Sequence, residues 1–130
     1  MSLPPDPDPD QFARDWIDDW NGHDLDRILA HYADGVVFTS PIVSRIMGVE
    51  DGTVRGKAAL RDYFAKGLAA FPDLHFQLMA LTTGVASLSM VLFNQAGRMV
   101  VQTLELDADR KVVRVVVSYG DTIPTGPGVI

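Results

Sequence analysis

The sequence predicts an α+β domain in which two amphipathic helices lead into a buried strand, followed by a third helix and four antiparallel strands. Apolar residues recur at helical spacing from Phe12 to residue 32, and again over residues 57–71. From Leu74 onward, short apolar runs separated by Gly, Asn and Asp replace that spacing, which is typical of strands joined by tight turns. Helices followed by a run of strands form an α+β layout.

The first helix is predicted to begin at Asp8-Pro9, because Asp suits the capping position and Pro suits the first helical position. Phe12, Trp16 and Trp20 follow at intervals of four residues and form one apolar stripe. Asn21-Gly22 ends the helix, since Gly readily adopts the left-handed conformation of a helix C-terminus.

Asp24 is predicted to cap a second helix that buries Leu25, Ile28, Leu29 and Tyr32. A turn at Asp34-Gly35 then leads into a short strand over residues 36–38, which Pro41 ends. Residues 42–55 show no sustained periodicity and contain two glycines, so they are predicted to be a loop or lid over the domain.

Gly56 precedes the third predicted helix, which buries Leu60, Phe64 and Leu68, together with Tyr63 and Phe71. The strands are predicted at residues 74–81, 85–94, 98–106 and 111–119. The resulting domain spans residues 10–121, between a Pro/Asp-rich flexible lead-in (1–9) and a Pro/Gly-containing tail (122–130).

Composition excludes several classes of function. The net charge of −6 disfavours nucleic acid as a partner, because phosphate would be repelled. The absence of Cys excludes disulfides, thiolate metal sites and Cys nucleophiles. No apolar run approaches the roughly 18–20 residues of a membrane span, and no secretory signal is visible. We therefore expect a cytoplasmic protein that has no membrane partner.

Two runs, WNGHDLDRILAHYADGVVFTSP and RGKAALRDYF, resemble the cone-shaped family named for nuclear transport factor 2. More narrowly, they are similar to its bacterial SnoaL-like and steroid delta-isomerase-like branch. The resemblance covers about residues 12–121; the later strands match only by pattern, through GR, LDADRKVVRV and SYGD. It implies an NTF2-like cone, with three helices packed on a strongly curved, mainly antiparallel sheet. It also implies a deep pocket at the open end, and often a homodimer formed through the outer sheet face.

The resemblance to the steroid isomerases also locates the positions of their catalytic groups. Their base, an Asp before the Pro that ends the first strand, corresponds to Ser40. Their oxyanion donors, a Tyr on the first helix and a protonated Asp on the penultimate strand, correspond to Trp16 and Gln102. Because a serine hydroxyl without an adjacent base cannot take a proton from carbon near neutral pH, steroid isomerisation by that mechanism is disfavoured.

Two residues are candidates for the missing acid or base. His31 lies at the edge of the buried stripe of the second helix, and Asp121 follows the last strand near the rim of the cone. The alternatives are a structural or surface histidine and a turn residue. No two histidines have metal-ligand spacing with a carboxylate, so neither a metal nor a cofactor is expected.

The stronger signal is a set of aromatic and polar residues, Phe93 among them, predicted to point into the cone. A mostly apolar wall with a few hydrogen-bonding groups is typical of small-molecule sites. The alternative is that these side chains simply fill the cone. The predicted pocket residues are Trp16, Trp20, Tyr32, Phe38, Ser40, Phe64, Gln102 and Tyr119.

The sequence therefore leaves three functions open. The first is an enzyme of the isomerase, cyclase, dehydratase or epoxide hydrolase kind, acting on a small hydrophobic substrate by acid–base chemistry. The second is a ligand-binding protein that has lost the catalytic base, as Ser40 suggests. The third is a structural dimer module with a filled cone. A sheet face bearing Val101, Thr103 and Val116 predicts a homodimer in each case.

Overall fold

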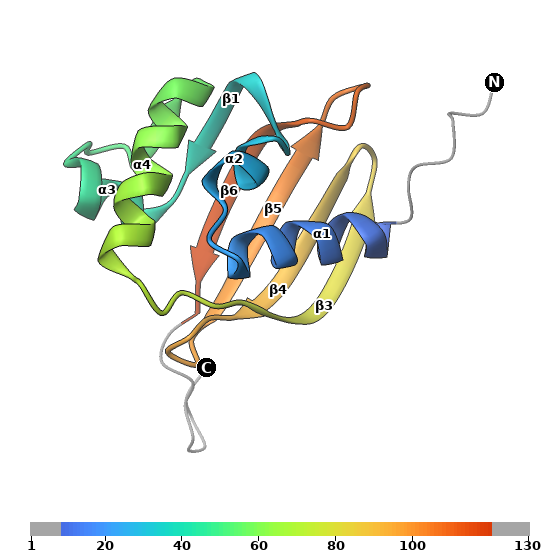
Figure 1. Ribbon diagram of the computed structural model, residues 1–130. Helices are drawn as coiled ribbons and strands as arrows, with labels where there is room; N and C mark the ends of the chain where they lie inside the picture. The colour runs from blue at the N-terminus through green and yellow to red at the C-terminus, as the bar shows by residue number, and fades with distance from the viewer. Residues whose placement is uncertain (1–8, 121–130) are drawn as a thin grey trace.

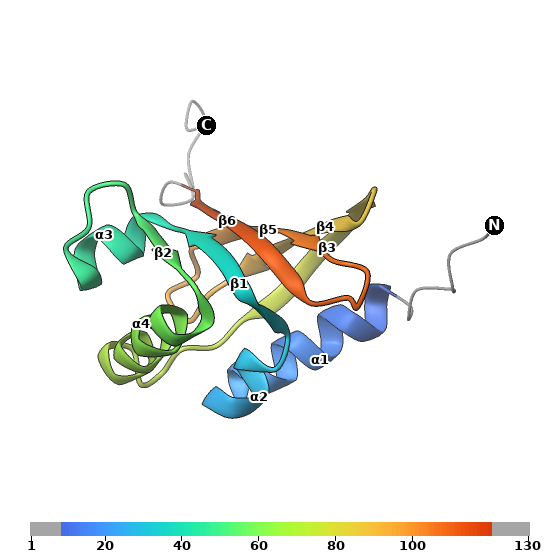
Figure 2. The same cartoon turned by 90° about the horizontal axis from the view of Figure 1, so that it is seen from above.

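The computed structural model describes residues 9–120, in which a curved six-stranded sheet carries helices on one face (Figures 1 and 2). The helices are α1 (Pro9–Asn21), α2 (Leu25–Leu29), α3 (Pro41–Met47) and α4 (Lys57–Ala70). The strands are β1 (Tyr32–Thr39), β2 (Thr53–Arg55), β3 (Gln77–Gly84), β4 (Ser87–Phe93), β5 (Met99–Leu106) and β6 (Val112–Tyr119).

The strand order is β2–β1–β6–β5–β4–β3. The β1–β6 pair is parallel and every other neighbouring pair is antiparallel. The predicted α+β class with a mainly antiparallel sheet is confirmed. The three predicted helices correspond to α1, α2 and α4, and the short helix α3 is additional.

Helix α1 lies across the sheet with its apolar stripe inward, so that Ala13, Trp16 and Trp20 are buried. Asp24 caps α2 as predicted, because its Oδ1 accepts the backbone N–H of Arg27 at 3.1 Å. None of the helices within residues 9–120 combines the length and hydropathy that crossing a membrane requires.

Strand β1 differs from the prediction in the residue at which it begins and in the conformation of Asp34-Gly35. Tyr32 begins this strand rather than ending α2, which stops at Leu29. The predicted turn at Asp34-Gly35 is instead an irregularity within β1, where the register with β6 shifts between Tyr32 and Val37. The extra residues are accommodated as a bulge, and the strand continues to Thr39.

The segment predicted as a loop, residues 42–55, forms α3 and β2, so that prediction was wrong. The Ser40 hydroxyl caps α3 by accepting the backbone N–H of Ile42 at 3.2 Å, and Pro41 occupies the first turn. Gly48 ends the helix with a left-handed φ of 69°. The chain then returns as β2, which pairs with the end of β1.

Strand β3 begins at Gln77, later than the predicted Leu74. The preceding residues are held by Asn21 instead of by a neighbouring strand. The Asn21 side chain donates to the carbonyl of Phe76 at 2.9 Å and accepts its N–H at 2.7 Å. This clamp fixes the connection from α4 to β3 against the end of α1, where it becomes one wall of the cavity described below.

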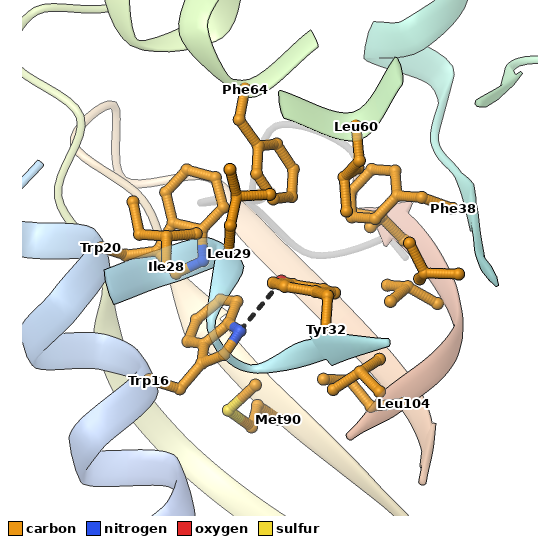
Figure 3. Packing of buried hydrophobic residues seen from close by; sticks show 14 of the residues in the cluster. Trp16, Trp20, Ile28, Leu29, Tyr32, Phe38, Leu60, Phe64, Met90 and Leu104 are labelled. Carbon is orange, nitrogen blue, oxygen red and sulfur yellow. Dashed lines mark hydrogen bonds between the residues drawn. The ribbon is translucent and has the colours of Figure 1, made fainter. Parts of the chain in front are cut away.

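Aromatic rings fill the space between α1, α4 and the sheet (Figure 3). The Phe64 ring meets its neighbours edge-on, with centroids 4.7 Å from Trp20, 5.5 Å from Tyr32 and 5.3 Å from Phe38. Such pairs each contribute about 0.5–1.5 kcal/mol beyond the area that they bury. Below them, Trp16 donates its indole N–H to the Tyr32 hydroxyl at 3.2 Å.

The opposite face of the sheet is not covered by any helix of the described residues (Figure 2). Outward positions on β4 and β5 include Val91, Thr103 and Val101, and Val116 on β6 is 39% exposed. Phe93 also belongs to this face, because it alternates with the buried Leu88, Met90 and Leu92. The expectation that Phe93 points into the cone was therefore wrong.

Candidate ligand-binding site

A cavity of about 220 Å³ lies at one end of the space between the helices and the sheet. Its walls come from α3, the second half of α4, residues 71–76, the β4–β5 turn and the end of β6. These segments are far apart in the sequence but meet at the same end of the molecule (Figure 1). The apolar lining consists of Trp20, Phe38, Ile42, Phe64, Phe71, Leu74, Phe76 and Val117.

Ser40 occupies a fixed position in the cavity wall. Its backbone N–H donates to the carbonyl of Gly52 at 2.9 Å, and its hydroxyl caps α3. A Cβ added at Gly52 would lie only 3.0 Å from the Ser40 carbonyl oxygen, and Gly52 has a φ of +63°. Glycine at this position thus allows the α3–β2 segment to pack closely against Ser40.

Two phenols, Tyr63 from α4 and Tyr119 from β6, line the cavity beside Ser40. Burial raises the pKa of Tyr63 well above its ordinary 10.0; the neighbouring Tyr119 raises it further, whereas hydrogen bonding with Ser40 lowers it in part. Burial also raises the pKa of Tyr119, against the opposing effects of Ser40, Arg98 and Arg45. Both phenols therefore remain protonated at neutral pH and can donate hydrogen bonds to a ligand oxygen.

Two buried polar atoms that lack hydrogen-bond partners belong to residues of the cavity wall. Gln102 is 5% exposed, and its side-chain oxygen has no partner among the described residues. Trp20 is 7% exposed, and its indole nitrogen has no partner within normal hydrogen-bond geometry, although it lies near enough to the Tyr32 hydroxyl to lower the pKa of that phenol. Buried polar groups in proteins are usually paired, so these two atoms are exceptions.

Two guanidinium groups complete the lining. Arg98, in the turn before β5, donates its Nε–H to the carbonyl of Gly120 at 2.8 Å and lies over the Tyr119 ring, 5.1 Å from the centroid. Arg45 comes from the last turn of α3. Within residues 9–120, the lining contains no carboxylate and no histidine, and no three acidic or histidine side chains converge to hold a metal ion.

The structure brings six of the eight predicted pocket residues to the cavity wall. They are Trp20, Phe38, Ser40, Phe64, Gln102 and Tyr119. The other two, Trp16 and Tyr32, are absent from the lining and are bonded to each other in the core. Of the oxyanion donors that the resemblance assigned to Trp16 and Gln102, only Gln102 therefore reaches the cavity.

One of the two acid–base candidates, His31, does not line the cavity. His31 lies in a separate shallow depression formed by α1, α2 and Lys111, where its Nε2 is 2.8 Å from Oδ2 of Asp19. Its ring also meets that of Phe12 edge-on at 5.5 Å. Asp121 lies outside the described residues, directly after Gly120.

The sequence prediction missed five polar residues of the cavity wall, which are Arg45, Tyr63, Asn94, Gln95 and Arg98. Tyr63 was assigned only to the buried side of its helix, although a buried tyrosine usually needs a partner for its hydroxyl, which is a usable signal. Arg45 lay in a segment interpreted as a loop, but Ser40-Pro41 is a recognisable helix start. Arg98 reaches the site through its contact with β6, and no local pattern predicts that contact.

The curved sheet, the helices on its inner face and the cavity between them define the NTF2-like fold class. An NTF2-like protein from Cytophaga hutchinsonii has a TM-score of 0.66 at 7% identity, covering 92% of this chain and 93% of that one. Within this class, the chain belongs to the SnoaL-like domain family, which matches residues 13–129.

Two further solved structures are similar to this chain. A SnoaL-like protein from Burkholderia thailandensis is 40% identical, covering 87% of this chain and 94% of that chain, with a TM-score of 0.83. A putative ketosteroid isomerase from Kribbella flavida is 20% identical, covering 91% and 82%, with a TM-score of 0.69, and shows the shared fold alone. A search of curated proteins gives no match.

Proposed function

We propose that this protein binds a small, mainly apolar molecule in the cavity. The observation that carries the proposal is a cavity of about 220 Å³ whose largely aromatic wall includes the hydroxyl-bearing residues Ser40, Tyr63 and Tyr119. A mostly apolar wall with a few hydrogen-bonding groups is typical of small-molecule sites. The proposed contacts are Trp20, Phe38, Ser40, Phe64, Gln102 and Tyr119, with Trp16 and Tyr32 packed behind them.

Cavity size limits the ligand. The volume of about 220 Å³ is below the roughly 300–1,000 Å³ of sites for drug-sized ligands. A ligand of one or two rings therefore fits this proposal better than a larger polycyclic molecule. Its oxygen would accept hydrogen bonds from Tyr63, Tyr119 or Ser40, since all three groups are protonated at neutral pH.

A thermal-shift screen against small aromatic alcohols, ketones and acids tests this proposal with a variant that blocks the cavity. Gly67 lines the cavity, and a Cβ added there meets no heavy atom within 4 Å. Gly67→Leu is expected to abolish the ligand-induced rise in melting temperature without lowering stability, because Leu favours a helix more than Gly does. Ala65→Leu, at an exposed position of α4, is the matched control and should retain the shift.

Either of two results would contradict binding in the cavity. No compound class shifts the melting temperature of the native protein, or the Gly67→Leu variant responds as strongly as the Ala65→Leu variant.

The paired phenols favour a second candidate function, an enzyme that stabilises an enolate formed from a small carbonyl substrate. Protonated donors aimed at a developing negative charge are a strong source of catalysis. Tyr63 and Tyr119 would bind the oxygen, and Asp121 is the sequence candidate for the base. Deuterium incorporation into a bound ketone in D₂O, followed by NMR, tests this role. Exchange that Asp121→Asn and Tyr63→Phe both suppress would support it, and exchange at the uncatalysed rate would reject it.

We also propose that the outer sheet face pairs two copies of the chain. The face carries Val91, Val101 and the exposed Val116 around the hydrogen-bonded pair Ser89–Thr103, whose side-chain oxygens are 3.0 Å apart. Light scattering at micromolar concentration should give a dimer mass, and Val116→Lys should give a monomer with an unchanged circular dichroism spectrum. A monomeric native protein would contradict this proposal.

Cytoplasmic residence and the lack of a nucleic-acid partner stay predictions from the cysteine-free, acidic sequence. Cell fractionation and an electrophoretic mobility assay with duplex DNA test them directly. Recovery of the protein outside the cytosol, or a mobility shift of the DNA, would contradict the corresponding prediction.

A further inference from the structure

The cavity concentrates positive charge in a protein that is acidic as a whole. The net charge is −6, yet within the described residues both charged groups of the lining, Arg45 and Arg98, are cationic. No carboxylate of residues 9–120 lies within ion-pair distance of either guanidinium. The other arginines in that part of the chain lie outside the lining, and several of them pair with acids, as Arg61 does with Asp26.

Arg98 is held in place by the protein. Its Nε–H donates to the Gly120 carbonyl at 2.8 Å, and its guanidinium lies 5.1 Å from the centroid of the Tyr119 ring. The turn that carries it is itself fixed, because Oδ1 of Asn94 accepts the backbone N–H groups of Ala96 at 2.9 Å and of Arg98 at 3.0 Å. An Arg fixed at a cavity wall loses little side-chain entropy when it binds an anion.

Arg45 approaches from the other side, on α3. That helix is anchored at its start by Ser40 and ended by Gly48. Arg45, Arg98 and Tyr119 all line the cavity, and the Arg98 guanidinium lies over the Tyr119 ring. Two cations and a neutral donor in one wall match the oxygens of a carboxylate.

Aromatic residues make up much of the remaining wall, which also includes the polar residue Gln102. A ligand that satisfies the whole cavity therefore has a flat apolar body, an acidic group at one end and a hydroxyl or carbonyl group toward the other. We infer that the ligand is a small aromatic or cyclic carboxylic acid, whose carboxylate lies between Arg45, Arg98 and Tyr119. This inference rests on the proposed ligand-binding function and specifies the chemical class of its ligand.

The test compares matched compounds that differ only in the acidic group. Benzoate and benzyl alcohol, cinnamate and cinnamyl alcohol, and 2-naphthoate and 2-naphthalenemethanol are titrated into the full-length protein by isothermal calorimetry. For the best-binding pair, the carboxylate is expected to bind about tenfold or more tightly than the alcohol, since hydrogen bonds to charged groups exceed those between neutral groups. The preference should shrink as salt increases, because Arg45 is exposed.

Two variants with the same change in net charge separate the effect of the local guanidinium on binding from the effect of the overall charge. Arg45→Gln is expected to weaken binding of the carboxylate about tenfold and to leave binding of the alcohol unchanged. Arg14→Gln, on the exposed side of α1, should change neither affinity. Arg98→Gln should act like Arg45→Gln, with an added effect on the turn that it anchors.

The outcomes distinguish this inference from the proposed function. If alcohols bind as tightly as acids, or Arg45→Gln weakens both equally, the cavity binds ligands but the inference of a carboxylate is wrong. If no member of any pair binds, both the ligand-binding function and its ligand class are contradicted. A carboxylate preference that Arg45→Gln removes and Arg14→Gln retains would establish the inference.

Discussion

The space between the helices and the sheet has two halves built from the same residue types. In the closed half, the Trp16 indole donates to the Tyr32 hydroxyl at 3.2 Å, and both residues are almost fully buried. In the cavity half, Tyr63 and Tyr119 lie beside Ser40 around an empty volume of about 220 Å³. Phe64 separates the two halves, with its ring against both Tyr32 and Phe38.

The difference shows that an aromatic residue predicted to point inward can serve either purpose. Where Trp and Tyr satisfy each other, the residues stabilise the fold. In the cavity half, the buried Gln102 Oε1 and Trp20 Nε1 have no hydrogen-bond partner among residues 9–120, so the residues of this wall do not complete their own hydrogen bonding. The following predictions separate the two halves, from the largest expected effect to the smallest.

Trp16→Ala should lower the free energy of unfolding by about 3–5 kcal/mol, because it removes a fully buried indole and leaves a cavity in the core. Urea denaturation followed by circular dichroism measures the change. A pocket position for Trp16, as predicted from the sequence, would make this substitution damage ligand binding more than folding, whereas its position in the closed half predicts the reverse. A loss below 1 kcal/mol would show that the closed half is not close-packed.

Alkaline pH should destabilise the protein because burial raises the pKa of all three tyrosines, that of Tyr32 from 10.0 to about 12. Below pH 10 each phenol is protonated in both states, so its contribution to stability is complete. Between pH 10 and 12 the unfolded chain ionises first, and stability falls by up to about 1.4 kcal/mol per pH unit for Tyr32. Urea unfolding curves of the native protein and of Tyr32→Phe across this pH range measure how much of the loss of stability comes from Tyr32. An identical pH dependence in the two proteins would contradict the predicted contribution of Tyr32.

Tyr32→Phe and Tyr63→Phe form a matched pair across the two halves. Tyr32→Phe leaves the Trp16 indole N–H without its partner and should cost about 1–3 kcal/mol of unfolding free energy. Tyr63→Phe removes a hydroxyl from the cavity wall. It should therefore lower the free energy of unfolding less than Tyr32→Phe does, and should reduce ligand affinity instead. Equal losses of stability in the two variants, measured by urea denaturation, would contradict the distinction between the halves.

Gln102→Leu should leave the free energy of unfolding unchanged or raise it by up to about 1 kcal/mol, because it replaces an unpaired buried acceptor with an apolar side chain of similar size. The same substitution should weaken binding of any ligand with a polar group directed at Gln102. Thermal denaturation and calorimetric titration measure both quantities. A marked loss of stability would show that the Gln102 amide supports the fold.

The fold was predictable to the level of its element order. Amphipathic spacing identified α1 and α4, and short apolar runs identified the last four strands, because these patterns depend on neighbouring residues. The bulge that carries Tyr32 into β1 and the start of β3 at Gln77 were missed, because β-sheet register and the Asn21 clamp on Phe76 are long-range effects.

Six cavity residues were predictable, because the family resemblance pointed to Ser40 at the strand end and Gln102 on β5, and the pattern of aromatic residues pointed to the other four. Distinguishing Trp16 from Trp20 was not possible from spacing, since both lie on the same helix stripe one turn apart. Arg98 was missed because its place in the cavity wall depends on a long-range contact: its Nε–H donates a hydrogen bond to the carbonyl of Gly120, directly after β6.

The most direct test of the central claim uses the fact that the chain has only two tryptophans, one in each half. In a Trp16→Phe variant, Trp20 alone reports on the cavity wall. Titration with cinnamate should change Trp20 fluorescence in a saturable manner, and adding Gly67→Leu should abolish the change. If the fluorescence does not respond, or if it responds equally with Gly67→Leu present, the cavity half is not a ligand site.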